Sequence, residues 1–215
     1  IAYLVAYWTF RTFKFLIGIF IGLRRSKRDL STDWMDKLRE TNLERFQELR
    51  YVYLCPVYSE SLDILDPTFQ SWANSDVGAE KIDVVMAMEG KKEELQVENF
   101  NKLKEKYGDK FGSMTYYVHP YGIPGEIAGV KGANINWAAR HYVEKLEQEG
   151  KDIGNYLLIS CDCDLRPHPK YLSAVTYKYL TVDEPDNRYY ASALHTFNNN
   201  IWSVPPIIRA QSNML

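Results

Sequence analysis

Hydrophobic runs and helical segments alternate along most of the chain, and this alternation constrains the fold more than any other feature. Four runs are rich in Val, Ile, Leu, Tyr and Met, as buried strands are: residues 51–58 (YVYLCPVY, ending at Pro56), 81–88 (KIDVVMAM), 113–120 (SMTYYVHP) and 155–161 (NYLLISC). Helices are expected at residues 61–73, 91–107, 133–149 and 169–180, and a fifth strand at 189–197. The alternation predicts an α/β fold, with a mostly parallel sheet flanked by helices.

The chain has 215 residues, which suits one such domain. It starts at Ile1 rather than Met and ends in SNML, so we expect a fragment of a longer protein, with the domain at residues 51–215 incomplete at its C-terminal end. The cysteines are Cys55, Cys161 and Cys163. An odd number in a chain of this length does not suggest a disulfide framework, and it favours a reducing compartment.

Residues 1–23 form an apolar segment long enough to cross a bilayer, which takes about 20 residues. Arg11 and Lys14 interrupt it, and each would cost roughly 2.5–3.5 kcal/mol at the bilayer centre. Residues 1–28 are therefore interpreted as a membrane-spanning or interfacial helix. In the interface, both cations would lie on its wet side. As part of a span, Ile1 to Phe10 would end a segment that starts before Ile1, with Arg11 at the level of the headgroups. A buried helix of a soluble core is a third interpretation. A signal peptide fits less well, because positive charges lie within and after the apolar run.

The sequence RRSKR follows the apolar segment and places that end on the cytoplasmic side by the positive-inside rule. Residues 29–50 are predicted to form a juxtamembrane helical connector, with Trp34, Leu38 and Leu43 as its apolar side. Six of the 26 Lys and Arg residues lie in the first 28 positions, which leaves 20 bases against 28 acids in the remainder. This distribution suits a membrane surface and argues against a nucleic-acid partner.

Asp162 and Asp164 follow the fourth hydrophobic run and are separated by one residue, in CDCDLRPHP. Carboxylate oxygens suit Mg²⁺ or Mn²⁺, which often bridge protein carboxylates to phosphates. A solvated turn is the alternative. Zinc held by Cys161, Cys163 and His168 is disfavoured, because no second Cys or His pair completes a tetrahedral set.

Other candidate residues follow the expected strands or precede a helix. Lys131 lies in the glycine-rich sequence GEIAGVKGANINWAAR, which leads into a helix N-terminus, a place that favours anions. Tyr58 and Glu89 follow the first and second strands. Tyr58 could stack on a base, or it could be an ordinary core tyrosine. Glu89 could accept hydrogen bonds from a base or a ribose, or it could be an ordinary surface acid. Because parallel strands end at one edge of a sheet, these segments are expected to meet there.

Three segments together resemble the family 2 glycosyltransferases, including their membrane-bound, cellulose-synthase-like branch. PVYSE resembles the family's P-x-Y-N-E, with Ser59 in place of Asn. VKGANINWA is similar to K-A-G-N-x-N-x-A, through Lys131, Asn134 and Asn136. DCDLRPHPKYL resembles D-A-D-x-x-P-x-P-x-Y-L, with Cys163 in place of Ala. The match covers about residues 51–180, with the motifs in the family's order.

The resemblance implies a GT-A fold and the metal-dependent, inverting transfer of a sugar from a nucleoside-diphosphate sugar to a saccharide or lipid-linked acceptor. It implies that Asp164 and Asp162 hold Mg²⁺ or Mn²⁺ and the diphosphate, and that Lys131 lies near the diphosphate. The positions that it implies near the nucleoside are Pro56, Tyr58, Glu60 and Glu89. It also implies membrane association, with the catalytic domain facing the cytoplasm.

Two departures from the family limit this interpretation. Glu89 stands where the family has Asp, and neither the catalytic-base aspartate nor the Q-x-x-R-W motif is recognised after residue 180. We therefore expect this chain alone to bind the donor and to transfer little or no sugar. A nucleotidyltransferase would need a glycine-rich loop with Arg and Lys after the first strand, which CPVYSES lacks. A non-catalytic, membrane-tethered nucleotide-binding module remains an alternative.

Overall fold

The structure, a computed structural model, describes residues 1–125, 130–190 and 205. Its central element is a sheet of four parallel strands in the order β3-β2-β1-β4. The strands are β1 (Arg50–Val57), β2 (Ile82–Glu89), β3 (Ser113–His119) and β4 (Tyr156–Ser160). The expected α/β class and parallel sheet are therefore confirmed.

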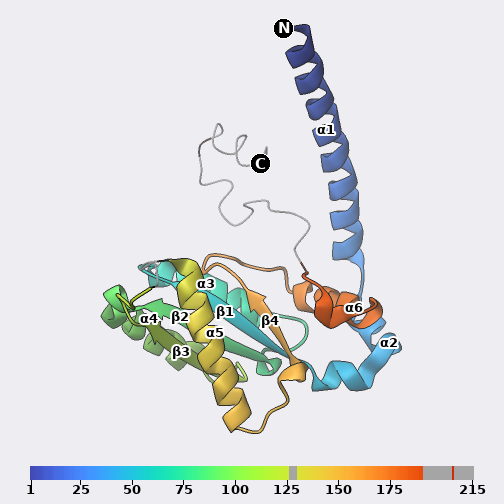
Figure 1. Ribbon diagram of the computed structural model, residues 1–215. Helices are drawn as coiled ribbons and strands as arrows, with labels where there is room; N and C mark the ends of the chain where they lie inside the picture. The colour runs from blue at the N-terminus through green and yellow to red at the C-terminus, as the bar shows by residue number, and fades with distance from the viewer. Residues whose placement is uncertain (126–129, 191–204, 206–215) are drawn as a thin grey trace.

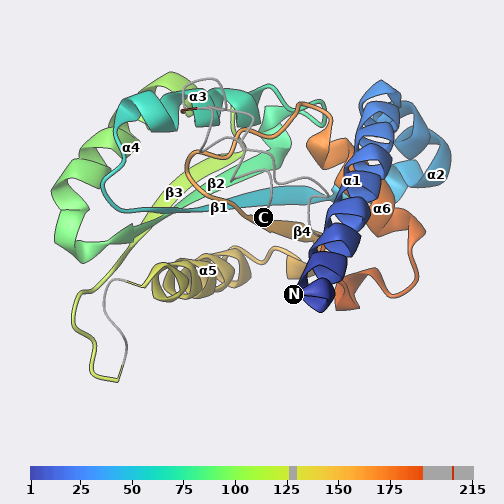
Figure 2. The ribbon, with the colours of Figure 1, turned by 90° about the horizontal axis from the view of Figure 1, so that it is seen from above.

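Helices cover both faces of this sheet (Figures 1 and 2). One face carries α3 (Leu62–Ala73) and α4 (Glu93–Tyr107), and the other carries α5 (Lys131–Gln148). Helix α6 (Tyr171–Thr181) lies at one end of the sheet, against α2 (Trp34–Glu48). Short 3-10 turns are η1 (Ala79–Lys81), η2 (Gly90–Lys92), η3 (Ile153–Asn155) and η4 (Pro185–Asn187).

Alternation along β1 divides the core into two clusters, as expected for a strand buried on both faces. Tyr53 and Cys55 point to the α3 side, where the Tyr53 ring stacks on Trp72 with centroids 4.6 Å apart. Val52 and Leu54 point to the α5 side, where Ala138 belongs to the same cluster. The same alternation in β2 and after β4 decides which polar side chains meet at the end of the sheet.

Helix α1 (Ala2–Ser31) rises away from the domain and carries no buried residue (Figure 1). It is longer than the apolar segment, because the basic residues 24–28 continue the helix instead of ending it. By length and composition it could cross a membrane, a property that a signal sequence near the N-terminus shares. It ends before α2, whose N-cap, Asp33, accepts a hydrogen bond from the Asp36 N–H at 3.0 Å.

Helix α2 contains a kink that the sequence analysis did not predict. Asn42 has non-helical backbone angles (φ −158°, ψ 80°), and its Oδ1 accepts a hydrogen bond from the Arg45 N–H at 3.0 Å. The side chain thus caps a new helical turn and changes the face that points inward. Leu43 is 44% exposed as a result, so its expected apolar role was wrong, and Phe46 is buried instead.

The predicted segment boundaries differ from the observed ones by a few residues. Pro56 lies inside β1, which continues to Val57. Helix α5 starts at Lys131, two residues earlier than expected, and α6 starts at Tyr171, two residues later than expected. Of the expected fifth strand, Tyr189 and Tyr190 are not in a strand, and residues 191–197 lie outside the described residues.

Candidate functional site

The carboxyl ends of β1 and β4 lie at the point where the order of the strands in the sheet changes direction. From β1 the chain adds β2 and β3 on one side, and it then returns to place β4 on the other side of β1. In open parallel sheets, ligands bind outside the strand ends at such a switch point. Tyr58 and Glu60 follow β1 here, Glu89 ends β2, and Asp162 and Asp164 follow β4.

Pro56 lies in β1 beyond the last residue that pairs with β4. It is buried and lies opposite Ala87 of β2, whereas pairing with β4 ends at Leu54 opposite Ser160. Proline has no N–H to donate, so it suits a strand position where a ladder has ended. Pro56 is therefore compatible with the end of the pairing between β1 and β4.

Lys131 and Asp162 come together at this edge of the sheet. Lys131 opens α5, and its Nζ forms an ion pair with Asp162 Oδ1. The two side chains are 55% and 60% exposed, so a ligand has access to both. The contact joins positions 31 residues apart and brings together two of the residues singled out from the sequence.

The D-x-D segment alternates between inward and outward side chains. Cys161 and Cys163 are 4% and 8% exposed and belong to the α3-side core, whereas Asp162 and Asp164 are exposed. A turn follows, in which the Leu165 N–H donates to the Asp162 carbonyl at 3.0 Å. The alternation therefore keeps both carboxylates at the surface and anchors the segment through its thiols, whose burial raises the pKa of Cys163 to about 12.

The exit from this segment is fixed to two other parts of the chain. The Asp76 N–H donates to the Pro169 carbonyl at 3.0 Å. Lys170 Nζ donates to the carbonyls of Leu30 and Thr32, at 3.1 and 2.9 Å, at the C-terminal end of α1. The segment after Asp164 is therefore held by hydrogen bonds, and it links the candidate site to the base of α1.

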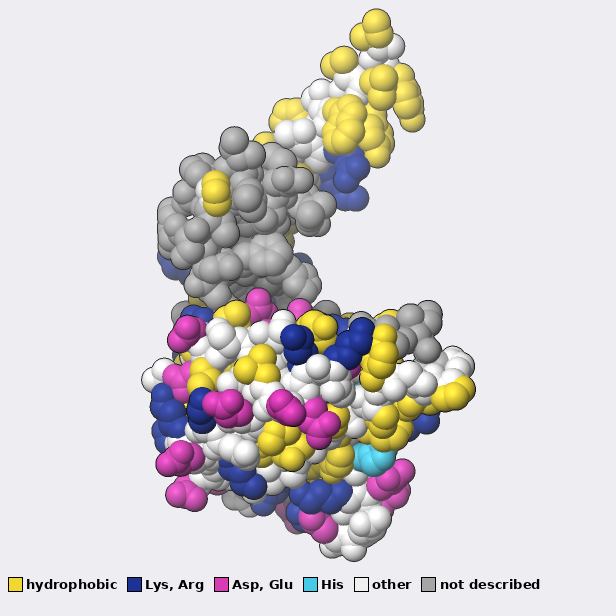
Figure 3. Space-filling view, turned by 90° about the vertical axis from the view of Figure 1, so that its left-hand side faces the viewer, with side chains coloured by type: hydrophobic (Ala, Val, Ile, Leu, Met, Phe, Trp, Pro, Cys, Tyr) yellow, Lys and Arg dark blue, Asp and Glu magenta, His cyan; other side chains and the backbone are white. Residues whose placement is uncertain are grey.

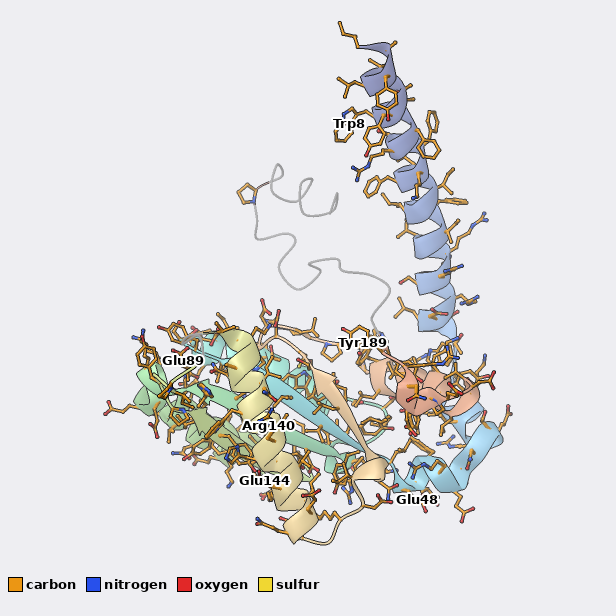
Figure 4. All side chains as sticks on the ribbon, in the orientation of Figure 1. Trp8, Glu48, Glu89, Arg140, Glu144 and Tyr189 are labelled. Carbon is orange, nitrogen blue, oxygen red and sulfur yellow. The ribbon has the colours of Figure 1, made fainter. Side chains whose placement is uncertain are left out.

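A second polar group lies at the ends of β2 and β3. Glu89 continues the alternation of Val85 and Ala87 toward the α5 side and is only 4% exposed, so it is not a surface acid (Figure 4). Lys91 lies next to it, with Nζ 4.1 Å from the Tyr121 ring centroid. The hydrogen bond with Tyr121 raises the pKa of Lys91, and Glu89 and Tyr58 act in the same direction.

Lys91 and Tyr121 were not singled out from the sequence. Gly90 explains how they meet, because a Cβ at this position would lie 3.2 Å from the His119 carbonyl oxygen and 3.4 Å from the Tyr121 nitrogen. Any other residue would push these two backbone segments apart by a few tenths of an ångström, so glycine favours their close approach. Tyr58 is 43% exposed beside this group, so its ring is available to a ligand.

The carboxylate and the backbone carbonyl of Glu60 both accept hydrogen bonds from other groups of the chain. Its Oε2 accepts hydrogen bonds from the backbone N–H groups of Tyr58 and Ser59, at 2.6 and 3.1 Å. Its carbonyl accepts from Asn99 Nδ2 of α4 at 3.0 Å. Glu60 therefore orders the loop that presents Tyr58, and its carboxylate is already engaged by that loop.

The two asparagines of the glycine-rich segment differ in environment. Asn134 is 5% exposed on the inner side of α5, and its Oδ1 has no hydrogen-bond partner in the described part of the chain. Asn136 is exposed. Buried amide oxygens nearly always accept a hydrogen bond, so Asn134, one turn from Lys131, has an unmet requirement that a ligand donor would satisfy.

The described residues contain no group of three or more His, Cys, Asp or Glu side chains suited to hold a metal ion. Two exposed carboxylates are nevertheless what Mg²⁺ or Mn²⁺ uses when phosphate oxygens and water complete its shell. The donor set therefore fits an ion that arrives with a phosphorylated ligand, and it does not form a closed protein cage.

No protein-family model matches this chain, and no curated protein matches it either. The functional assignment therefore depends on the residues and on their arrangement.

Proposed function

We propose that this chain is the donor-binding part of a membrane-associated family 2 glycosyltransferase with a GT-A fold. The observation that carries the proposal is the contact of Lys131 with Asp162 at the switch point of the sheet. These residues come from two of the three ordered motifs, and the third motif supplies Tyr58 to the same edge. A cation beside two carboxylates suits a metal-bound diphosphate.

Each residue has a chemical task in this proposal. Asp162 and Asp164 would hold Mg²⁺ or Mn²⁺, which neutralises the diphosphate leaving group as a Lewis acid. Lys131 transfers its hydrogen bond from Asp162 to a phosphate oxygen, and a bond of this kind is stronger than a neutral one. Asn134 Oδ1, which has no hydrogen-bond partner in the described part of the chain, would accept a hydrogen bond from a hydroxyl of the sugar donor.

The nucleoside would lie on the other side of β1. Tyr58 offers an exposed ring for stacking, and Glu89 offers a carboxylate to N–H or O–H groups of the base or ribose. Lys91 and Tyr121 border the same group. The acceptor would be a saccharide or a lipid-linked sugar, supplied on the cytoplasmic side of a membrane that α1 enters with its basic flank inside.

Calorimetric titration with nucleoside diphosphates, with and without Mn²⁺, tests the proposal. We expect binding that depends on Mn²⁺ and is lost in Asp164→Asn and Asp162→Asn. Asp36→Asn is the matched control, because Asp36 is also exposed and ion-paired, to Arg39 at 2.8 Å, but lies on α2. Unchanged metal-dependent binding in both site variants would exclude the proposed site.

A further inference from the structure

In the first 23 residues of the chain, the charged side chains of α1 are confined to one narrow stripe. Among the first 23 residues only Arg11 and Lys14 carry charged side chains. At 3.6 residues per turn, the two cations fall within an arc of about 60° that also contains Tyr7 and Gly18. These four residues are called the cationic stripe below. Figure 3 shows hydrophobic side chains gathered on the far part of α1, and Figure 4 shows Trp8 projecting from it.

The cationic stripe is too narrow for a helix that lies flat on a membrane. Leu4, Phe10, Phe15 and Ile21 border it closely on the helical wheel, and each is exposed. An interfacial helix has a broad polar face, and in that orientation these side chains would meet water. A helix that is apolar nearly all round is instead surrounded by lipid or by other helices.

In a spanning helix the two cations lie near the bilayer centre. The basic flank begins at Arg24, and Lys14 and Arg11 precede it by about 15 and 20 Å along the axis, in a hydrocarbon layer about 30 Å thick. Cations close to a helix end can reach the headgroups, but cations at this depth cannot. Lys170 holds the base of α1 through Leu30 and Thr32, so this depth is tied to the domain.

Residues 1–28 contain no acidic side chain that could face the cationic stripe. No acid precedes Asp29, which pairs with Arg28 at 3.0 Å. The Arg11 guanidinium lies 5.6 Å from the ring centroid of Trp8 and 6.0 Å from that of Tyr7, which shields the charge without neutralising it. A second copy of α1 would oppose cation to cation, so the missing partner differs from this helix.

We propose that the cationic stripe is a docking surface for another transmembrane helix that carries a carboxylate near the bilayer centre. An intramembrane cation is stable where it faces a protein anion. All charged side chains among the first 28 residues are Lys or Arg, so the anion must come from elsewhere. Gly18 lies one turn from Lys14, and the space beside it is open, with nothing within 4 Å of a Cβ built there. Small residues allow helix backbones to approach closely, so Gly18 suits the contact line of such a pair.

The test uses the full chain in phosphatidylcholine vesicles with a labelled transmembrane peptide. The peptide is a leucine helix of about 20 residues with one central glutamate, and its control has leucine there. Energy transfer measures association. We expect the glutamate peptide to bind about tenfold more tightly than its control, or ~1.4 kcal/mol. This preference for the glutamate peptide should vanish in the double variant Arg11→Leu/Lys14→Leu. It should persist in the control variant Arg24→Leu/Arg25→Leu, which removes two cations from the basic flank and leaves the cationic stripe unchanged.

Three results would overturn the proposal. They are equal binding of the two peptides, a glutamate preference that survives removal of Arg11 and Lys14, and loss of the preference when phosphatidylglycerol is added. The last result would identify anionic lipid as the partner of these cations. A preference that persists with phosphatidylglycerol supports a helix partner.

Discussion

Replacing Lys131 with methionine should change two affinities in opposite directions. In the free chain Lys131 Nζ occupies Asp162 Oδ1, so a divalent ion must displace it. The pair is 55% and 60% exposed, and exposed pairs are worth about 0.2–1 kcal/mol. Removing the lysine should therefore raise the affinity for Mn²⁺ alone by up to about fivefold.

The same substitution should weaken nucleoside diphosphate binding. A charge-assisted hydrogen bond contributes about 1.5–3 kcal/mol, so its loss should lower the affinity in saturating Mn²⁺ by about tenfold to a hundredfold. Calorimetry measures both quantities. Lys151→Met is the matched control, because Lys151 pairs with Glu149 at 2.7 Å at the other end of α5. If both affinities move together, or neither moves, the assigned role of Lys131 is wrong.

Three further predictions concern stability and reactivity. Gly112→Ala should destabilise the fold by about 1–3 kcal/mol in urea unfolding, because the added Cβ would lie 2.7 Å from the Glu80 carbonyl oxygen. Gly132→Ala should stabilise α5 by up to about 1 kcal/mol, because nothing lies within 4 Å of a Cβ there and alanine favours a helix. A larger loss of stability in Gly132→Ala than in Gly112→Ala would contradict this packing. Burial raises the pKa of Tyr51 to about 12 in the folded chain, whereas the ordinary value in the unfolded chain is 10. The protonated Tyr51 therefore contributes its full stabilisation of the fold below pH 10, and this stabilisation is lost as the pH rises toward 12. In Tyr51→Phe, the fall in the free energy of unfolding between pH 10 and pH 12 should be smaller by on the order of 2 kcal/mol. An unchanged dependence of the free energy of unfolding on pH would refute this prediction. Cys163, held as a thiol by burial, should not react with an aromatic disulfide reagent at pH 8 until the chain unfolds, and rapid labelling of the folded chain would show that it is accessible.

The strands were predictable because their signal is local. Each is a hydrophobic run bounded by polar residues, and all four appear within about two residues of the expected positions. The two central strands, β1 and β2, are buried on both faces, which requires a continuous apolar sequence. The parallel order follows from the intervening helices. The kink at Asn42 was missed because an amide side chain there competes with the backbone for the Arg45 N–H, a contest that apolar periodicity does not reveal.

The site was predictable only as a list of residues. Parallel strand ends meet at one edge, so the motifs after β1, β2 and β4 were expected together, and they are. The contact of Lys131 with Asp162 depends on how α5 packs on the sheet, and the burial of Glu89 depends on strand alternation beneath that helix. Lys91 and Tyr121 meet because Gly90 permits close backbone contact, which no motif records.

The most direct test of the central claim, that Asp162 and Asp164 bind a metal ion together with the donor diphosphate, is electron–nuclear double resonance on Mn²⁺ bound to the full chain with a nucleoside diphosphate. We expect a hyperfine coupling between the bound Mn²⁺ and the phosphorus nuclei of the diphosphate, and we expect this signal to be lost in Asp162→Asn/Asp164→Asn. Mn²⁺ that binds without phosphorus coupling, or a coupling that survives in the double variant, would contradict this claim.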